Sequence, residues 1–234
     1  MKEYLNYIDG KWKASKSQKF FEKRNPSNRD EVIGLFPKSV REDVEEAVLA
    51  AKKAFKMWSK VPAPKRGETM RRAAELLLER KEEIAKLLAR ENGKIMKEAR
   101  GDVQEGIDTA FYAFGEGRRL FSFNTPSELP DKFALTFRMP VGVFAVITPW
   151  NFPIALPAWK IFPALLAGNT IVFKPPSDAP ACAYELVKIL EEAGTPPGVI
   201  NLVFGGGGEV GEILLSHPDI RGVAFTGSSE VGSR

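Results

Sequence analysis

The chain has 234 residues, of which 44% are hydrophobic and 27% are charged, values that are typical of a globular protein and argue against intrinsic disorder. Its only cysteine, Cys182, cannot form an internal disulfide or a cluster of thiolate ligands, so the sequence favours a reducing, cytoplasmic location and excludes disulfide-rich and zinc-ribbon folds. Because His217 is the only histidine, no metal site is predicted either.

The net charge of +4 is distributed unevenly along the chain. Of the 34 Lys and Arg residues, 27 lie in residues 1–120, together with 20 of the 30 Asp and Glu residues. Acidic and basic residues are interleaved there, so the sequence lacks the single-sign stripe of a nucleic-acid-binding module, which is the least favoured alternative. No apolar run is long enough to cross a membrane, and the N-terminus has no hydrophobic signal core, so no membrane segment is predicted.

The N-terminal half is predicted to form a hairpin followed by helices. The Asp9-Gly10 dipeptide tolerates the positive φ angles of a tight turn. Ser39 and Glu42 have the spacing of a capping box at the start of the first helix. The predicted elements are a hairpin over residues 5–13 and helices over 39–58, 65–90 and 97–121. Trp12 and Trp58, with Trp159 further along the chain, are expected to be core or staple residues.

From residue 141 the pattern changes to strands that alternate with helices. The run Val143–Ile147 is continuously apolar, as in a strand that is buried on both faces. Asp178 is expected to cap one of the helices, which ends before Gly194. Strands are predicted over 143–147, 170–173, 199–203 and 223–225, with intervening helices at 155–167, between 178 and 194, and after a glycine loop at 205–208. This alternation predicts a parallel α/β sheet whose ligands bind beyond the carboxyl ends of the strands.

Each predicted strand is followed by residues that suit a dinucleotide. They are Trp150 and Asn151, then Lys174 and Ser177, then the glycine loop, then Gly227 and Ser228. Glycine lets backbone N–H groups approach phosphate, a helix start favours negative charge, and Lys174 could bind ribose hydroxyls or a phosphate. The spacing of Gly205, Gly207 and Gly211 is one residue longer than the usual fingerprint, so this loop alone is weak evidence.

Four segments resemble the aldehyde dehydrogenase superfamily in order and spacing. They are TPWNFP (148–153), PALLAGN (163–169), VFKPPSDAP (172–180) and FTGSSEVG (225–232). The resemblance covers nearly the whole chain but only about the N-terminal half of a family member. It implies an α/β fold with a Rossmann-like parallel sheet and flanking helices, in an incomplete nucleotide-binding domain. The implied parts are a hairpin and helical layer at 1–121, an oligomerisation hairpin at 122–140 and an NAD(P)-binding core at 141–234.

The resemblance also implies an activity, the NAD(P)+-dependent oxidation of an aldehyde to a carboxylic acid. In that family a cysteine attacks the aldehyde, an asparagine amide and a backbone N–H hold the oxyanion, and a glutamate-activated water releases the acid. By this match Asn151 is the oxyanion asparagine, and Lys160 is a candidate for proton relay. The implied cofactor-binding residues are Thr148, Pro149, Trp150, Asn151, Lys174, Ser177, Gly207, Gly211, Phe225, Thr226, Gly227, Ser228 and Val231.

Two features depart from the family pattern. The family's nucleophile and general base lie downstream of the FTGS segment, and the sequence ends at Arg234 before either, so the chain is expected to be truncated and inactive alone. Cys182 does not resemble the nucleophile and is expected to be a buried packing residue. Ser177 stands where NAD-preferring members commonly carry a glutamate that would repel a 2′-phosphate, so NADP+ is expected to be accepted as well as NAD+.

Some alternatives remain open. On the residues alone, Asn151 could be a turn residue and Lys160 an ordinary helix lysine. The chain could also be a non-catalytic nucleotide-binding fragment or a subunit of a dehydrogenase. For a full-length protein the resemblance implies a homo-oligomer, a dimer or tetramer, with a small-molecule aldehyde as substrate and no nucleic-acid or membrane partner.

Overall fold

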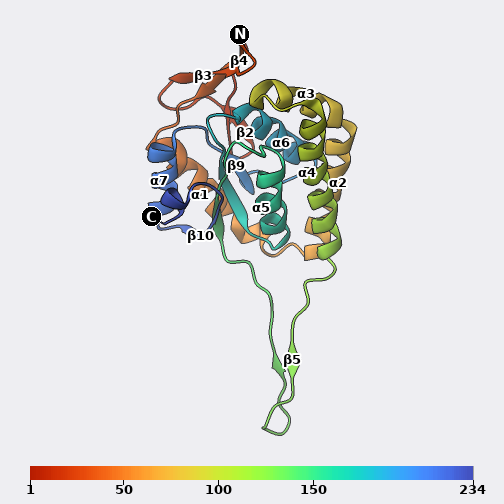
Figure 1. Cartoon of the computed structure of the whole chain (residues 1–234). Coiled ribbons are helices and arrows are strands. Elements are labelled where there is room, and N and C mark those ends of the chain that lie inside the picture. The colour runs from red at the N-terminus through yellow and green to blue at the C-terminus, as the bar shows by residue number, and fades with distance from the viewer. Residues whose placement is uncertain (234) are drawn as a thin grey trace.

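A six-stranded sheet in the order β10-β7-β8-β9-β1-β2 forms the centre of the structure, a computed structural model that describes residues 1–233 (Figure 1). Arg234, where the sequence ends, lies outside the described residues. The first four strands in this order run parallel, and β1 and β2 extend the sheet in the antiparallel direction. The strands are β1 (Asn6–Ile8), β2 (Lys11–Lys13), β7 (Val143–Ile147), β8 (Thr170–Lys174), β9 (Ile200–Leu202) and β10 (Ile220–Phe225). The predicted α/β fold with a parallel sheet is confirmed for this core.

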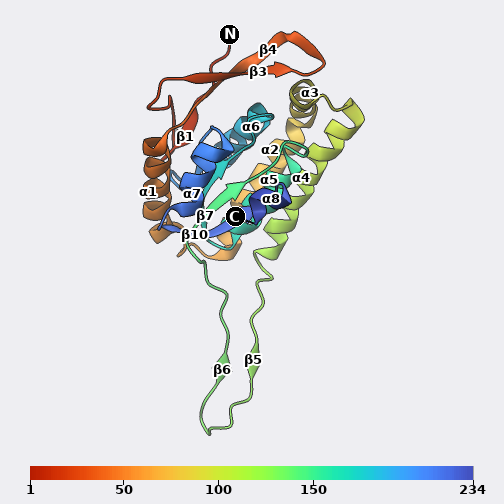
Figure 2. The same ribbon diagram turned by 60° about the vertical axis from the view of Figure 1, so that its left-hand side comes forward.

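Helices cover both faces of the sheet (Figure 2). One face carries α1 (Arg41–Trp58) and α7 (Glu212–Ser216), and the other carries α2 (Ala63–Glu79), α3 (Lys81–Asn92), α4 (Met96–Glu116), α5 (Ala155–Leu166) and α6 (Pro180–Glu192). Adjacent residues of β8 belong to different cores, because Val172 packs with α1 while Ile171 and Phe173 pack with the larger helical layer. This alternation explains why the predicted strands read as continuous apolar runs. No helix within residues 1–233 combines the length and the hydropathy needed to cross a membrane.

The N-terminal hairpin forms as predicted, with positive φ angles of 52° at Asp9 and 74° at Gly10. The helix predicted over 65–90 is instead two helices, because the backbone leaves helical geometry at Arg80, with φ −102° and ψ 13°. The Arg80 side chain pairs there with Glu192 of α6. The break lets α3 turn to pack against α6, a contact that helical periodicity cannot reveal. The next helix, α4, ends at Glu116 rather than at residue 121.

The capping box predicted at Ser39 and Glu42 is wrong. Val40 is the N-cap of α1, and its amide donates to the Asp43 side chain at 2.9 Å. Ser39 lies one residue earlier, where its hydroxyl accepts a hydrogen bond from the Asn6 amide at 2.8 Å. A partner 33 positions away in the sequence therefore takes the side chain that local spacing had assigned to the helix.

Asp178 does not cap α6, which is the second capping correction. The N-cap is Ala179, and the amides of Ala181 and Cys182 donate to the two carboxylate oxygens of Glu91 at 2.6 and 2.9 Å. Glu91 is fully buried and belongs to α3, so one carboxylate joins the last turn of α3 to the first turn of α6. It accepts from backbone N–H groups that have no partner within the helix, as a local cap would.

The burial of Glu91 predicts a pH-dependent stability. Burial raises the pKa of Glu91 to about 7, although the two amides oppose the rise. Between the unfolded pKa of 4.5 and this value the folded chain holds a proton that the unfolded chain has lost, so stability falls as the pH rises. The loss is of the order of 3 kcal/mol from about pH 4 to about pH 8. Urea unfolding of Glu91→Gln across this range is expected to give a flatter pH profile than the natural chain, and two parallel profiles would contradict the assignment.

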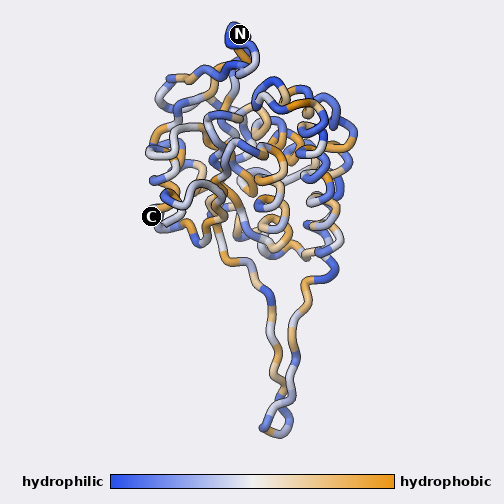
Figure 3. Tube along the Cα trace, in the orientation of Figure 1, coloured by the Kyte–Doolittle hydropathy of each residue, from blue (hydrophilic) through white to orange (hydrophobic). Residues whose placement is uncertain are grey.

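Two hairpins lie outside the central sheet. The first, β3 (Phe20–Asn25) with β4 (Asn28–Pro37), lies beyond α1 and α3 and was not predicted, because its strands are rich in charged residues and their alternation is weak. The second is a long arm over residues 119–141 that projects from the body, with a short ladder between β5 (Asn124–Thr125) and β6 (Ala134–Leu135). Hydrophobic residues recur along this arm (Figure 3). Phe123, Phe133 and Phe137 are 73%, 90% and 77% exposed.

Candidate functional site

The carboxyl ends of three parallel strands form one row. Ile147, the last residue of β7, pairs with Lys174 on one side and with Phe225 on the other, and these two residues end β8 and β10. Because parallel strands place their carboxyl ends at the same edge, the segments predicted to bind the cofactor all leave the sheet here. The structure therefore brings together the segments that begin at Thr148, after Lys174 and at Thr226.

A cleft of about 610 Å³ opens beside this row. It is lined by Ile147, Gly207, Gly208, Gly211, Glu212, Leu215, Ser216, Phe225 and Val231. Four of these residues, Gly207, Gly211, Phe225 and Val231, are among those predicted for the cofactor. The cleft combines an apolar wall with glycine backbone, which is the mixture that a dinucleotide requires.

The glycine loop at 205–208 runs into a turn of π-helix, Gly207–Gly211, which leads directly into α7. Gly205 precedes it with φ 150°, and a Cβ there would lie 2.5 Å from Val210, so only glycine fits this position without rearrangement. At Gly207 and Gly208, by contrast, a Cβ would meet nothing within 4 Å. These two positions leave the backbone open to a ligand, although their spacing is not that of the usual fingerprint.

Lys174 lies at the inner end of this site. Its side chain is buried, passes beside Gly211, and donates from Nζ to the carbonyl oxygen of Pro175 at 2.9 Å. Burial lowers the pKa of Lys174 to about 8, while the nearby Asp178 acts in the opposite direction. Ser177 is exposed three residues later, with its hydroxyl 3.5 Å from the carbonyl oxygen of Gly205. A buried ammonium whose hydrogen bond within residues 1–233 goes to a carbonyl oxygen fits a phosphate or ribose oxygen of a dinucleotide.

On the other side of the row, residues 148–154 form an irregular loop between β7 and α5. Thr148 is buried and its hydroxyl has no hydrogen-bond partner within residues 1–233. Trp150 is 54% exposed and Asn151 is exposed, while Pro149 is partly buried. The Asn151 side chain carries no hydrogen bond to another described residue, so its amide is available to a ligand.

Lys160 and Trp159 lie on α5, directly after this loop. Burial lowers the pKa of Lys160, as a lysine with a proton-transfer role would require, although burial alone does not assign that role. Trp159, predicted to be a core or staple residue, does not belong to the core, because its side chain is 50% exposed. With Tyr112 and Pro163 it lines a shallow hollow of about 390 Å³ between α4 and α5. The helical periodicity did not predict that Tyr112, which lies on the outer face of α4, would line a hollow with Trp159.

The prediction for Cys182 is confirmed. The thiol is free and fully buried in the first turn of α6, and burial, with the Glu91 carboxylate, raises its pKa well above the ordinary value. Such a thiol is a poor nucleophile. Within residues 1–233 no three His, Cys, Asp or Glu side chains gather in a way that could hold a metal ion.

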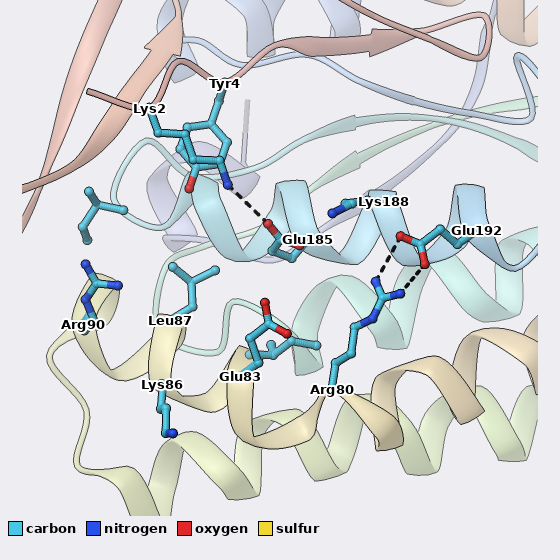
Figure 4. A pocket seen from close by; sticks show the side chains of 12 residues that line it. Lys2, Tyr4, Arg80, Glu83, Lys86, Leu87, Arg90, Glu185, Lys188 and Glu192 are labelled. Carbon is cyan, nitrogen blue, oxygen red and sulfur yellow. Dashed lines mark hydrogen bonds and ion pairs between the residues drawn. The ribbon is translucent and has the colours of Figure 1, made fainter.

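A larger groove of about 760 Å³ lies elsewhere, between α3, α6 and the N-terminal segment (Figure 4). Four of its eight charged side chains pair with one another, Arg80 with Glu192 and Lys2 with Glu185. It contains none of the residues predicted for the cofactor or for catalysis. The groove is therefore an ion-paired surface, and size alone does not mark the functional site.

Comparison with known proteins gives consistent matches over nearly the whole chain. A family model described as the aldehyde dehydrogenase family matches residues 12–234. The alpha-ketoglutaric semialdehyde dehydrogenase of Bacillus subtilis (strain 168) is 42% identical over 229 residues, which are 98% of this chain and 47% of that protein. The chain therefore spans about half the length of the curated relative it matches.

Solved structures give the same result. An NADP-dependent enzyme from E. coli superposes with a TM-score of 0.96 at 35% identity, over 99% of this chain and 48% of the other. An NAD-dependent aldehyde dehydrogenase from Sinorhizobium meliloti also superposes with a TM-score of 0.96 at 35% identity, over 99% and 47% of the two chains. Proteins described by either cofactor thus share this fold.

Proposed function

Since this chain belongs to the aldehyde dehydrogenase family, we propose that it supplies the NAD(P)-binding site and the oxyanion-binding asparagine of an enzyme that oxidises an aldehyde to a carboxylic acid. The observation that carries the proposal is the row formed by Lys174, Ile147 and Phe225. The glycine-lined cleft lies on one side of this row and the Asn151 loop follows it. A dinucleotide and a carbonyl substrate would therefore meet at the end of β7.

Each side chain has a role that its surroundings permit. The Lys174 ammonium would hold a ribose or phosphate oxygen, and Thr226, Gly227 and Ser228 would border the pyrophosphate at the start of the short helix α8 (Ser229–Gly232). The Asn151 amide would donate to the oxygen of the aldehyde as negative charge develops on it, which lowers the barrier to attack at the carbonyl carbon. The cofactor, when bound, supplies the hydride acceptor.

Other cofactor contacts follow from the same arrangement. Phe225 and Val231 would supply the apolar wall for the adenine, and Gly207 and Gly211 the backbone beside the phosphates. Thr148, Pro149 and Trp150 would border the nicotinamide end. The unpartnered hydroxyl of Thr148 is consistent with this placement, because buried polar groups normally have a partner.

We assign the nucleophile and the general base to the part of the family that these 234 residues do not cover. Cys182 is unsuitable because its thiol is buried and its pKa is raised. The test is an aldehyde oxidation assay, followed by NAD(P)H absorbance, on the chain, on Cys182→Ala and on the protein of the complete reading frame. Activity is expected only in the last. Activity of the chain above that of Cys182→Ala would contradict the assignment, and an inactive complete protein would favour a non-catalytic subunit.

NADP+ use is proposed on the basis of Ser177, which brings no negative charge to the ribose site. Ser177→Glu is expected to weaken NADP+ binding about tenfold, since a carboxylate near a 2′-phosphate is repelled even where water screens both charges. NAD+ binding should change less than about twofold. Equilibrium titrations of both cofactors with the natural chain and the variant test this. Equal weakening of both cofactors, or preference of the natural chain for NAD+ by about tenfold, would remove Ser177 as the determinant.

The substrate is proposed to be an aldehyde that carries a carboxylate. This rests on the name of the Bacillus subtilis relative, a semialdehyde dehydrogenase. The measurement is kcat/KM of the complete protein for a semialdehyde and for an unsubstituted aldehyde of the same chain length. A higher value for the unsubstituted aldehyde would reject this substrate class. A cytoplasmic location stays a prediction, which the free thiol of Cys182 supports.

We propose that the arm over residues 119–141 joins copies of the complete protein into a dimer or tetramer. Side chains such as Phe123, Phe133 and Phe137 are too exposed for a segment that stays in water, and the two short strands have open edges. Replacing residues 122–140 with a short Gly-Ser linker is expected to reduce the mass in solution to that of a monomer, as measured by light scattering. An unchanged mass would assign the interface to another surface.

A further inference from the structure

The loop that carries Asn151 is held by side chains from a different part of the chain, the junction between α3 and α4. Asn92, the last residue of α3, donates from Nδ2 to the carbonyl oxygen of Trp150 at 2.7 Å. Asp102, in the second turn of α4, accepts from the amides of Ile154 and Ala155 at 3.3 and 2.8 Å. These contacts lie on both sides of Asn151 in the sequence.

Lys94 connects the two contacts. Its ammonium lies 3.0 Å from the second carboxylate oxygen of Asp102 and 3.8 Å from the centre of the Phe152 ring. Asp102 is buried, and Lys94 is largely buried, so this ion pair is shielded from solvent. Lys94 therefore fixes the Asp102 carboxylate and also the residue that directly follows Asn151.

The contact from Asn92 sets the orientation of a peptide group. The peptide between Trp150 and Asn151 is trans, so its C=O and N–H point in opposite directions. Because the carbonyl oxygen of Trp150 faces Asn92, the backbone N–H of Asn151 faces away from the helical layer. The side chain of Asn151 is left exposed between neighbours that are held on both sides.

The close approach of α4 to the loop is a separate observation. A Cβ on Gly106 would lie 2.7 Å from Cγ2 of Ile154, so α4 packs against the end of the loop at a distance that only glycine permits. Asp102 lies one turn before Gly106 on the same helix. The helix is thus close enough for a short aspartate, rather than a longer side chain, to reach the loop amides.

We propose that Asn92, Lys94 and Asp102 form a clamp that positions Asn151 for its role at the oxyanion. The clamp residues are positioning residues: Asn92 and Asp102 act through the backbone on each side of Asn151, and Lys94 acts through Asp102 and the Phe152 ring. The catalytic part of this inference rests on the proposed function of Asn151. The structural part, that the clamp holds the loop, does not rest on that function, so the catalytic and structural parts can be tested separately.

The first test is hydrogen exchange of the 234-residue chain, followed by mass spectrometry of peptides that cover residues 148–156. Asn92→Ala, Lys94→Met and Asp102→Asn are expected to speed exchange of this segment about tenfold and to leave the strands of the sheet unchanged. Lys97→Met, an exposed lysine of α4, is the matched control. Unchanged exchange in the three variants would overturn the clamp, whatever the activity of the protein.

The second test is a double-mutant cycle in the complete dehydrogenase. Asn92→Ala and Lys94→Met are each expected to lower kcat about tenfold, with NADP+ affinity changed less than about twofold, because misplacement of one catalytic group affects the chemical step. In the Asn151→Ala background the same substitutions should cost nothing further. Equal losses in both backgrounds would show a general structural role and overturn positioning. If Asn151→Ala itself has no effect, the proposed function fails while the exchange experiment still decides the clamp.

Discussion

Replacing Asn151 with alanine in the complete dehydrogenase is expected to lower kcat by about 10² to 10³ fold, the usual cost of removing one donor from an oxyanion site. The reason is that the side chain is exposed at the end of β7 with its amide free of other partners. The backbone on either side of Asn151 is held by hydrogen bonds with Asn92 and Asp102, so the loop is positioned before substrate binds. Preorganised donors of this kind stabilise the transition state more than the ground state.

Steady-state kinetics with saturating NADP+ give this result directly. KM for the cofactor should stay within about twofold, because the proposed partner of the Asn151 amide is the substrate oxygen. Asn28→Ala, at the exposed first residue of β4, is the matched control and should be fully active. A kcat of Asn151→Ala above about a third of the natural value would contradict the oxyanion role and favour the alternative that Asn151 is a turn residue.

Lys174→Met is expected to weaken NADP+ binding by about 10 to 100 fold, since a hydrogen bond to a charged group contributes about 1.5 to 3 kcal/mol. The substitution keeps most of the buried volume while removing the ammonium. The low pKa of about 8 adds a pH dependence, because only the protonated lysine attracts phosphate. Affinity of the natural chain should therefore fall as the pH rises above about 8, and the variant should show no such fall.

The matched control for this prediction is Lys53→Met, an exposed lysine on the outer side of α1. It should bind NADP+ as the natural chain does at every pH. If Lys174→Met kept its affinity, or showed the same fall above pH 8, another group would hold the cofactor and the row of strand ends would need a different interpretation.

Much of the fold follows from the sequence because its signals are local. The apolar run at Val143–Ile147 and the Asp9-Gly10 turn are short-range patterns, and both appear where they were predicted. The two capping predictions failed because the partners are distant in the sequence. Ser39 binds Asn6 rather than its own helix, and Glu91 caps a helix that begins 89 positions later, at Pro180.

For the site, too, residues marked by local patterns could be predicted and those that depend on distant contacts could not. Lys174 and the glycine loop could be assigned to one site because each follows a predicted strand, and parallel strands bring their carboxyl ends together. The role of Asn151 came from family resemblance, since an asparagine before a phenylalanine and a proline is otherwise a turn signal. The contacts of Asn92 and Asp102 with that loop could not be predicted, because spacing along α3 and α4 does not report which loop these residues face.

The most direct test of this account is calorimetric titration of NADP+ and NAD+ into the 234-residue chain, alongside Lys174→Met and with folding checked by circular dichroism. We predict one dinucleotide per chain, with NADP+ bound by the natural chain and weakened in Lys174→Met. A folded chain that binds neither dinucleotide at about 1 mM would contradict the claim that the strand ends of β7, β8 and β10 form a cofactor site.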